Sequence, residues 1–269
     1  MTRMSLRYWL TVSAISLAAL GLTACDSNPK DDTSKWTPER LYTEAKEEAS
    51  AGAYEKAIKL YERLEGRAAG TVLAQQAQLE RAYLLWKTAE SAQALATIER
   101  FLKLHPTSPA YDYALYLQGL INFNDSLGFL GSLAAQDLSE RDQQASRDAY
   151  QSFRQLTERF PQSSYAEDAR LRMNYIVNSL AAYEVHVARY YFRRGAYVAA
   201  ANRAQTTVQE FQQSPAVEEA LYIMAQSYDR LGLTQLRDDA DRVLRTSFPN
   251  TKIYQNGLGN KSTPWWQPW

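Results

Sequence analysis

The sequence has a single cysteine, Cys25, among its 269 residues, so no disulfide can form within the chain. Glycine is also scarce, with 11 residues, and neither sign of charge is in excess, because 30 basic residues balance 30 acidic ones. A chain without a basic surplus lacks the electrostatic footprint of a nucleic-acid-binding protein, and we expect no nucleic-acid partner. Ala, Leu, Glu, Gln and Arg are abundant instead, a mixture that favours helices held together by packing alone.

Long apolar runs are missing too, since the one over residues 9–22 is too short to span a bilayer. This run follows a cationic start and ends with small residues directly before Cys25, the pattern of a bacterial lipoprotein signal. We predict a signal peptide over residues 1–24 and S-diacylglycerol and N-acyl chains on Cys25, which would tether the protein to a membrane surface. The alternative is an ordinary secretory signal followed by an unrelated cysteine. Removing residues 1–24 takes away two arginines and no acid, which leaves 28 basic against 30 acidic residues, a net charge of −2.

The next segment, residues 25–37, is polar, contains proline and has no periodicity. We expect it to be a flexible spacer between lipid and domain. Thr37 followed by Pro38 is typical of a helix start, with threonine as the N-cap and proline in the first turn.

Internal repetition organises the rest of the chain. Three segments combine an aromatic ring, prolines and a serine that lies six residues before an alanine: Ser108 with Ala114, Ser163 with Ala169, and Ser214 with Ala220. We expect proline to end one helix, the hydroxyl to cap the next helix, and the alanine to allow close packing. Phe248 and Pro249 begin a fourth, shorter copy.

Alanines twelve residues apart mark the helix pairs between these segments, as in Ala45 with Ala57 and Ala82 with Ala94. This spacing resembles the tetratricopeptide repeat, a 34-residue helix–turn–helix unit. We therefore predict an all-α solenoid of about five such repeats. Their ranges are 38–70, 72–107, 109–161, 163–213 and 215–249.

Two repeats depart from the standard length. The third contains an apolar, glycine-punctuated insertion over residues 124–140, which is either a tucked-in loop or an exposed contact surface. The fourth predicts one long helix over residues 164–194 that ends at Gly195. The predicted organisation is an N-terminal part over 38–161, a C-terminal part over 162–249 and an extended tail over 250–269.

No group of residues in the sequence points to catalysis. His105 precedes a proline at a predicted helix end, and His186 has no partner at metal-ligand spacing. The sequence contains neither a Gly-rich phosphate loop nor a nucleophile elbow. We predict a binding protein that is not an enzyme and has no metal and no cofactor other than the lipid.

The first helices of tetratricopeptide repeats line a concave groove, and here their predicted stripes are rich in aromatic residues. Such a groove suits an extended peptide, because rings accept apolar side chains while their polar edges take hydrogen bonds. The alternative is that several of these residues belong to the core between helices. The predicted groove residues are Tyr42, Lys46, Leu79, Tyr83, Trp86, Tyr113, Tyr116, Leu120 and Phe123.

These features together resemble one family of bacterial lipoproteins. The lipidated cysteine, the five repeats, the insertion in the third repeat and the stretch from Arg194 to Arg203 (RGAYVAAANR) are similar to the BamD (ComL) family of the outer-membrane β-barrel assembly (Bam) machinery. The resemblance implies an anchor in the periplasmic leaflet of the outer membrane and recognition of the C-terminal signal of unfolded outer-membrane β-barrel proteins by the N-terminal repeats.

The resemblance also implies protein partners. It implies docking of the C-terminal repeats on a POTRA domain of BamA and contact with BamC and other Bam lipoproteins. By matching motif, Tyr197, Asn202 and Arg203 are candidates for the side that faces BamA, and Phe129 and Leu130 of the insertion are further candidate contacts.

Two features depart from the family pattern. Asp26 directly after the cysteine retains lipoproteins in the inner membrane under the rule of enteric bacteria, so we expect the source to sort by other positions. The tail places Trp265, Trp266 and Trp269 next to prolines, and we expect it to lie against another subunit or the membrane interface. A pilotin for a secretin, or a scaffold for a cell-envelope or division complex, is the alternative function.

Overall fold

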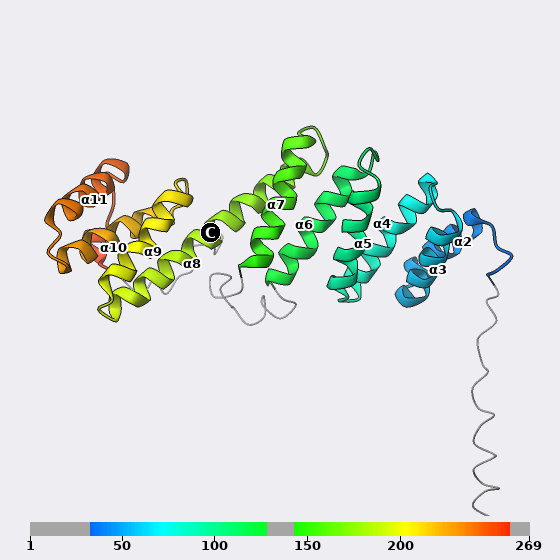
Figure 1. Cartoon of the computed structure of the whole chain (residues 1–269), viewed down its shortest axis with the longest axis horizontal. Helices are drawn as coiled ribbons and strands as arrows, with labels where there is room; N and C mark the ends of the chain where they lie inside the picture. The colour runs from blue at the N-terminus through cyan, green and yellow to red at the C-terminus, as the bar shows by residue number, and fades with distance from the viewer. Residues whose placement is uncertain (1–32, 128–142, 259–269) are drawn as a thin grey trace, which may run out of the picture.

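The computed structural model describes residues 33–127 and 143–258, and within these ranges its regular elements are all helices. Figure 1 shows the helices side by side in an elongated array, with α2 near one end and α11 near the other. The helices are α2 (Pro38–Ser50), α3 (Tyr54–Arg67), α4 (Val72–Lys87), α5 (Ser91–Leu104), α6 (Tyr111–Leu127), α7 (Gln144–Arg159), α8 (Ala166–Arg193), α9 (Tyr197–Glu210), α10 (Ala216–Arg230), α11 (Thr234–Ser247) and α12 (Ile253–Asn256).

Each of the helices α2 to α11 packs against its neighbours in sequence, and one helix pair falls in each of the five predicted repeats. In addition α2 contacts α4, α4 contacts α6, and α8 contacts α10. Contacts between the first helices of successive repeats are what a tetratricopeptide stack requires. The predicted all-α tetratricopeptide solenoid is therefore confirmed.

The first helix begins as predicted, with Pro38 in its first turn and Thr37 Oγ1 accepting a hydrogen bond from the backbone N–H of Arg40 at 3.3 Å. The end of the predicted spacer is not free, however. The guanidinium of Arg67 donates to the carbonyls of Thr33 and Trp36 at 2.8 Å each, and Trp36 packs on the core of the first repeat. The chain is thus held against α3 from Thr33 onward.

The turns inside four of the repeats share one backbone conformation. The residue with positive φ is Gly52 (81°), Ala89 (64°), Gly195 (76°) or Gly232 (72°). In each turn the next residue donates its N–H to the carbonyl five residues earlier, which closes the helix end as in a Schellman motif. Glycine adopts this conformation without strain, so Ala89 is the exception in the second repeat.

The predicted hydroxyl caps take a different form. Ser108, Ser163 and Ser214 each accept a hydrogen bond from the backbone N–H two residues further on, at 3.4, 3.2 and 3.3 Å. These bonds form turns in the loop before the helix, and the N-caps of α8 and α10 are Tyr165 and Pro215. The serines therefore shape the connections between repeats and do not cap the helices directly.

Small side chains lie where helices cross, as the sequence predicts. Ala45, Ala57, Ala82 and Ala94 are completely buried. In the third repeat the approach of α6 and α7 is closer still, because Gly119 lies directly against the ring of Phe153.

The long helix of the fourth repeat is confirmed as α8, whose 28 residues span about 42 Å at 1.5 Å per residue. It packs on α7 and also on α9 and α10, and Figure 1 shows it running between the two parts of the array. Arg189 of α8 holds Glu219 of α10 through two hydrogen bonds of 2.8 Å.

The insertion begins later than predicted, because α6 continues to Leu127. The rest of the insertion, with Phe129 and Leu130, lies outside the described residues. The same holds for Cys25 and for the tail tryptophans Trp265, Trp266 and Trp269. Within residues 33–127 and 143–258, no helix is long and apolar enough to cross a bilayer, and no group of three or more metal-binding side chains gathers.

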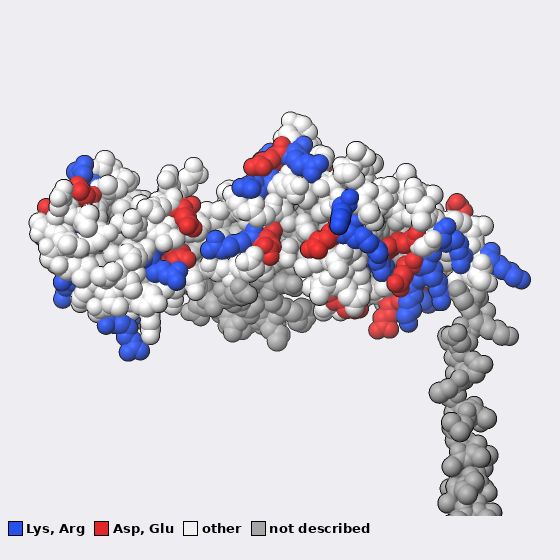
Figure 2. Space-filling model, viewed as in Figure 1, with Lys and Arg blue, Asp and Glu red and all other residues white. Residues whose placement is uncertain are grey.

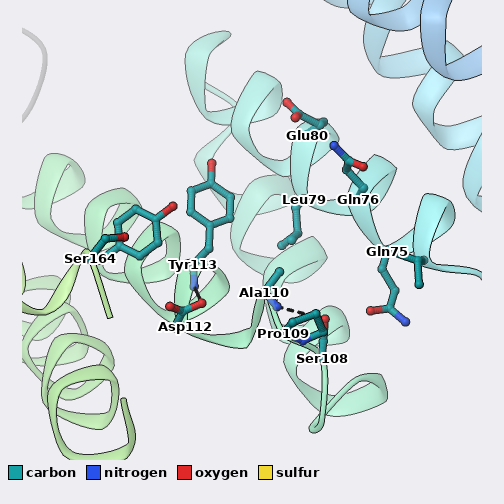
Figure 3. A pocket seen from close by; sticks show the side chains of 12 residues that line it. Gln75, Gln76, Leu79, Glu80, Ser108, Pro109, Ala110, Asp112, Tyr113 and Ser164 are labelled. Carbon is teal, nitrogen blue, oxygen red and sulfur yellow. Dashed lines mark hydrogen bonds between the residues drawn. The ribbon is translucent and has the colours of Figure 1, made fainter. Parts of the chain in front are cut away.

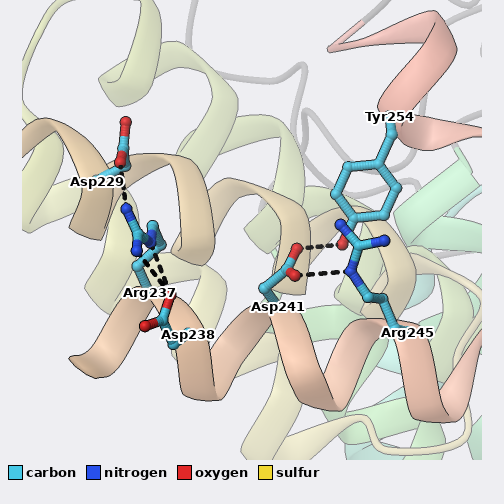
Figure 4. Close-up of polar contacts among 6 residues, drawn as sticks. All are labelled: Asp229, Arg237, Asp238, Asp241, Arg245 and Tyr254. Carbon is cyan, nitrogen blue, oxygen red and sulfur yellow. Dashed lines mark hydrogen bonds and ion pairs between the residues drawn. The ribbon is translucent and has the colours of Figure 1, made fainter. Parts of the chain in front are cut away.

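Polar contacts fix the far end of the array (Figure 4). Arg237 of α11 bonds to Asp229 at 3.1 Å and to Asp238 at 2.8 Å. Asp241 accepts hydrogen bonds from Arg245 at 2.7 Å and from the hydroxyl of Tyr254, which ties α12 to α11.

Candidate functional site

A cavity of about 500 Å³ lies between the second, third and fourth repeats, and we call it the α4–α6 cavity. Its walls are the first half of α4, the loop and first turn that begin α6, and the loop before α8 (Figure 3). The serine turns described above hold the two loops in place. The lining residues are Val72, Gln75, Gln76, Leu79, Glu80, Ser108, Pro109, Ala110, Asp112, Tyr113, Ser164 and Tyr165.

Tyrosines form one wall of the α4–α6 cavity. The rings of Tyr113 and Tyr165 lie 5.6 Å apart, and Tyr165 stacks on Tyr116 at 4.7 Å with an angle of 19° between the planes. Tyr116 in turn donates its hydroxyl to Asp168 of α8 at 2.7 Å. This chain of contacts gives the wall a fixed shape, which is what a preformed binding site needs.

The two carboxylates of the lining differ in their partners. Asp112 accepts hydrogen bonds from the hydroxyl of Ser163 and from the backbone N–H of Tyr113, both at 2.7 Å. Glu80 is half-buried and forms no hydrogen bond or ion pair with the described residues, although the charge of Lys46 acts on it. Burial raises the pKa of Glu80, and the nearby Lys46 opposes that rise.

Tyr113 faces the same space. Burial, with a smaller contribution from the charge of Glu80, raises the pKa of Tyr113 to about 12, so its phenol stays neutral at physiological pH. In Figure 3 the phenol oxygen of Tyr113 and the carboxylate of Glu80 lie on the same side of the cavity. Together they present a hydrogen-bond donor and an acceptor beside the aromatic wall.

The structure brings only part of the predicted groove together. Leu79 and Tyr113 line the cavity, and Tyr116 supports it from behind. Tyr42 accepts a hydrogen bond from the lining residue Gln76, and Lys46 is exposed beside Glu80.

The remaining predicted groove residues lie elsewhere. Tyr83 and Trp86 pack edge to face at 6.0 Å in the second half of α4, outside the lining, and both also pack against the core of the second repeat. Leu120 is half-buried against the core of the third repeat. Phe123 is only 8% exposed and belongs to that core, because Tyr175 of α8 covers its ring at 5.8 Å.

Sequence reasoning missed most of the polar lining. Gln75 and Gln76 lie four and three residues before the predicted residue Leu79 on α4, so helical spacing could have found them, and Glu80 follows Gln76 by four residues. The loop residues Pro109 and Tyr165 carry no such signal, since only the packing of successive repeats brings the two loops together.

The three candidates in the fourth repeat all lie on α9. Tyr197 begins α9 and packs edge to face on Phe192 at 5.4 Å, and Asn202 is exposed. Arg203 is bound within the chain, since its guanidinium forms an ion pair with the buried Glu184 at 3.0 Å. The hydrogen bond and charge of Glu184 raise the pKa of Arg203, and the pair links α8 to α9.

Charged side chains are distributed unevenly over the face shown in Figure 2. Lys and Arg gather at the N-terminal end of this face, and acidic side chains lie among them. In this part of the chain Glu65 lies 2.6 Å from both Arg81 and Arg100. Neighbouring carboxylates therefore partly neutralise the basic residues of the first two repeats.

Comparison with known proteins places the chain in a family. A family model described as an outer membrane lipoprotein (YfiO) matches residues 34–243. The outer membrane protein assembly factor BamD of Neisseria meningitidis serogroup A is 46% identical over 265 residues, which cover 97% of this chain and 98% of that protein. The protein of the same name from Vibrio cholerae is 36% identical over 235 residues, or 87% and 97% of the two chains.

Among solved structures, the MamA protein aligns over 82% of this chain and 97% of its own, with 15% identity and a TM-score of 0.33, a likeness too low to support an argument. The family model and the curated relatives are sufficient by themselves, because both extend over most of the sequence. The chain belongs to the BamD family of outer membrane lipoproteins.

Proposed function

We propose that this protein is a non-enzymatic subunit of the Bam complex that binds the C-terminal signal of unfolded β-barrel proteins in the α4–α6 cavity. The observation that supports this role is the cavity itself, which joins an aromatic wall to a polar lining. Its volume of about 500 Å³ is in the range of sites that bind small ligands or a few side chains of a peptide.

The lining provides the two kinds of contact that an extended chain needs. The faces of Tyr113 and Tyr165 and the side chain of Leu79 accept apolar or aromatic side chains. The amides of Gln75 and Gln76 and the hydroxyls of the loop serines supply hydrogen bonds for peptide groups. A segment of an unfolded barrel strand alternates apolar and polar side chains and offers both.

The C-terminal repeats form the second proposed contact surface, for a POTRA domain of BamA. Tyr197 and the exposed Asn202 are the candidates whose side chains form no hydrogen bond with the described residues, while Arg203 holds α8 and α9 in register through Glu184. Exposed apolar side chains of α11, Leu236 and Val243, extend the surface that is open to a partner at this end of the array.

Attachment to the outer membrane follows from lipidation of Cys25, and the periplasmic leaflet is the proposed location. Cys25→Ser is expected to move the protein from the membrane fraction to the soluble fraction of the cell envelope. A pilotin or scaffold role is not favoured, since the curated relatives described above are named as outer membrane protein assembly factors. Purification from detergent-solubilised membranes separates the two roles, because assembly predicts BamA in near-equal amount.

Site-specific photocrosslinking in cells tests the cavity. A photoreactive residue at Gln76 or Tyr113, both in the lining, is expected to form adducts with newly made barrel proteins, and these adducts should disappear when the substrate loses its C-terminal segment. Glu99 on α5 is the matched control, because it is exposed but lies outside the lining of the cavity. Absence of substrate adducts at both lining positions, with adducts elsewhere on the protein, would refute the proposed site.

A further inference from the structure

We propose that the α4–α6 cavity selects a cationic side chain within the bound segment, paired with Glu80, and does not hold the free C-terminal carboxylate. This inference rests on the proposed function, because it specifies which part of the signal occupies the cavity. It identifies Glu80 as a specificity-determining residue and the ligand as an extended peptide with a lysine or arginine next to an apolar side chain.

The charge of the lining is the first observation. The twelve lining residues include two carboxylates, Glu80 and Asp112, and no lysine, arginine or histidine. A site that binds a terminal carboxylate needs cationic groups or converging N–H donors, since a carboxylate can only accept hydrogen bonds. Here a carboxylate would instead meet two like charges. The lining therefore repels an anion and attracts a cation.

The second observation is that the two carboxylates are not equivalent. Asp112 is satisfied by Ser163 and by the backbone N–H of Tyr113. Glu80 has no hydrogen-bond or ion-pair partner among the described residues, although it is half-buried. A partly buried carboxylate without a partner is unfavourable in the free protein, and a bound cation removes that penalty.

The third observation is the position of Glu80 relative to the apolar surface. Figure 3 shows its carboxylate and the Tyr113 hydroxyl on the same side of the cavity, while Leu79 lies closer to the loop that begins α6. Lysine and arginine side chains have an apolar stem and a charged head. The stem can lie along the Tyr113 ring while the head reaches Glu80, with the phenol as an additional acceptor.

The groups that face Glu80 from neighbouring helices do not replace such a ligand. Its charge acts on Tyr42 of α2, Tyr61 of α3 and Tyr113 of α6, all of which are neutral at physiological pH. Lys46 of α2 is the basic group whose charge opposes the rise of the Glu80 pKa, but it is exposed and lies outside the lining. Lys46 therefore serves as a useful control.

Peptide binding to the full-length lipoprotein in detergent tests the inference. The probe is a fluorescein-labelled ten-residue peptide that alternates aromatic and polar residues and ends in phenylalanine. A lysine is moved through its polar positions, with glutamine at the same position for comparison, and each peptide is made with a free and an amidated C-terminus. At one position, lysine is expected to bind about tenfold more tightly than glutamine, and amidation is expected to leave affinity unchanged.

Variants of the protein assign the preference to one side chain. Glu80→Gln keeps the shape of the residue and should abolish the lysine preference. Glu99→Gln removes the same charge from an exposed position on α5, outside the lining, and should retain the preference. Circular dichroism of each variant verifies that it is folded.

The outcomes separate this inference from the proposed function. If none of the peptides binds, the proposed peptide site itself fails. If the peptides bind but lysine and glutamine forms are equal, or if Glu80→Gln keeps the lysine preference, the assignment of Glu80 is wrong while the peptide site stands. If amidation weakens binding and Lys46→Ala does the same, the terminal carboxylate is bound beside Lys46 and the inference is overturned.

Discussion

The close approach of α6 and α7 allows a sharp test of how the third repeat is packed. A Cβ atom added at Gly119 would lie 2.4 Å from Cε1, 2.6 Å from Cδ1 and 2.8 Å from Cζ of Phe153. Favourable contacts between carbon atoms occur at about 3.5–4.0 Å. Phe153 is completely buried and packs in the core of the third repeat. Gly119→Ala must therefore displace either the ring or one of the two helices.

The expected magnitude follows from two opposing effects. Overpacking of a well-filled core costs about 1–3 kcal/mol, and alanine in a helix interior gains about 1 kcal/mol over glycine. Since the three clashes involve one rigid ring, we expect the cost of overpacking to dominate. Gly119→Ala should lower the free energy of unfolding by up to about 2 kcal/mol. Urea unfolding of the non-lipidated protein, followed by far-ultraviolet circular dichroism, measures this change.

Gly66→Ala is the matched control, because Gly66 also lies in a helix and an added Cβ there meets no atom within 4 Å. This variant should be as stable as the wild type or more stable, by up to about 1 kcal/mol. Combining Gly119→Ala with Phe153→Leu should cost less than the sum of the two single changes, since the smaller side chain makes room for the methyl group. If Gly119→Ala matches Gly66→Ala in stability, the helices are not as close as described.

Thermal unfolding across a range of pH tests three further side chains. Burial raises the pKa of Glu80 above 4.5, so its ionised carboxylate destabilises the fold once the pH has risen through that raised pKa. Glu80→Gln should therefore increase the Tm at pH 7 and have no effect on the Tm below about pH 4. Arg203→Ala leaves the buried Glu184 unpaired and should cost about 1–3 kcal/mol at pH 7, less than a fully buried pair because Arg203 is half exposed. Burial alone would raise the pKa of Asp168, but hydrogen bonds from Arg172 and Tyr116 lower it below 3.8. Asp168→Asn should therefore reduce the Tm at pH 7, and the difference should vanish as pH falls through that lowered pKa.

The parts of the fold that depend on local sequence were predictable. Buried alanines at a spacing of twelve residues, turn glycines such as Gly195 and the long helix α8 all follow from patterns within one or two helices. The serines show where this reasoning ends. A serine shortly before a helix can either cap the first turn of the helix or form a turn in the loop that precedes it. The backbone N–H of Tyr165 donates to the hydroxyl of Ser163, which shows that the turn in the loop is formed.

The candidate site was harder to predict, because it is made by segments that are distant in sequence. Tyr113, Tyr116, Leu120 and Phe123 form one stripe on α6, and helical spacing alone assigns the same environment to all four. In the structure the start of the stripe is open to the α4–α6 cavity and its end is covered. A single periodic pattern thus contains both lining and core residues.

The long helix α8 is the physical reason for this difference along α6. Its first turn approaches Tyr116 through Asp168, while the next turns cover Phe123 with Arg172 at 5.2 Å and with the Tyr175 ring at 5.8 Å. A helix that ended before Tyr175 would leave the Phe123 ring without the cover of that side chain. The length of α8 could be inferred from the sequence, but its direction relative to α6 could not, and that direction determines which aromatic residues remain available to a ligand.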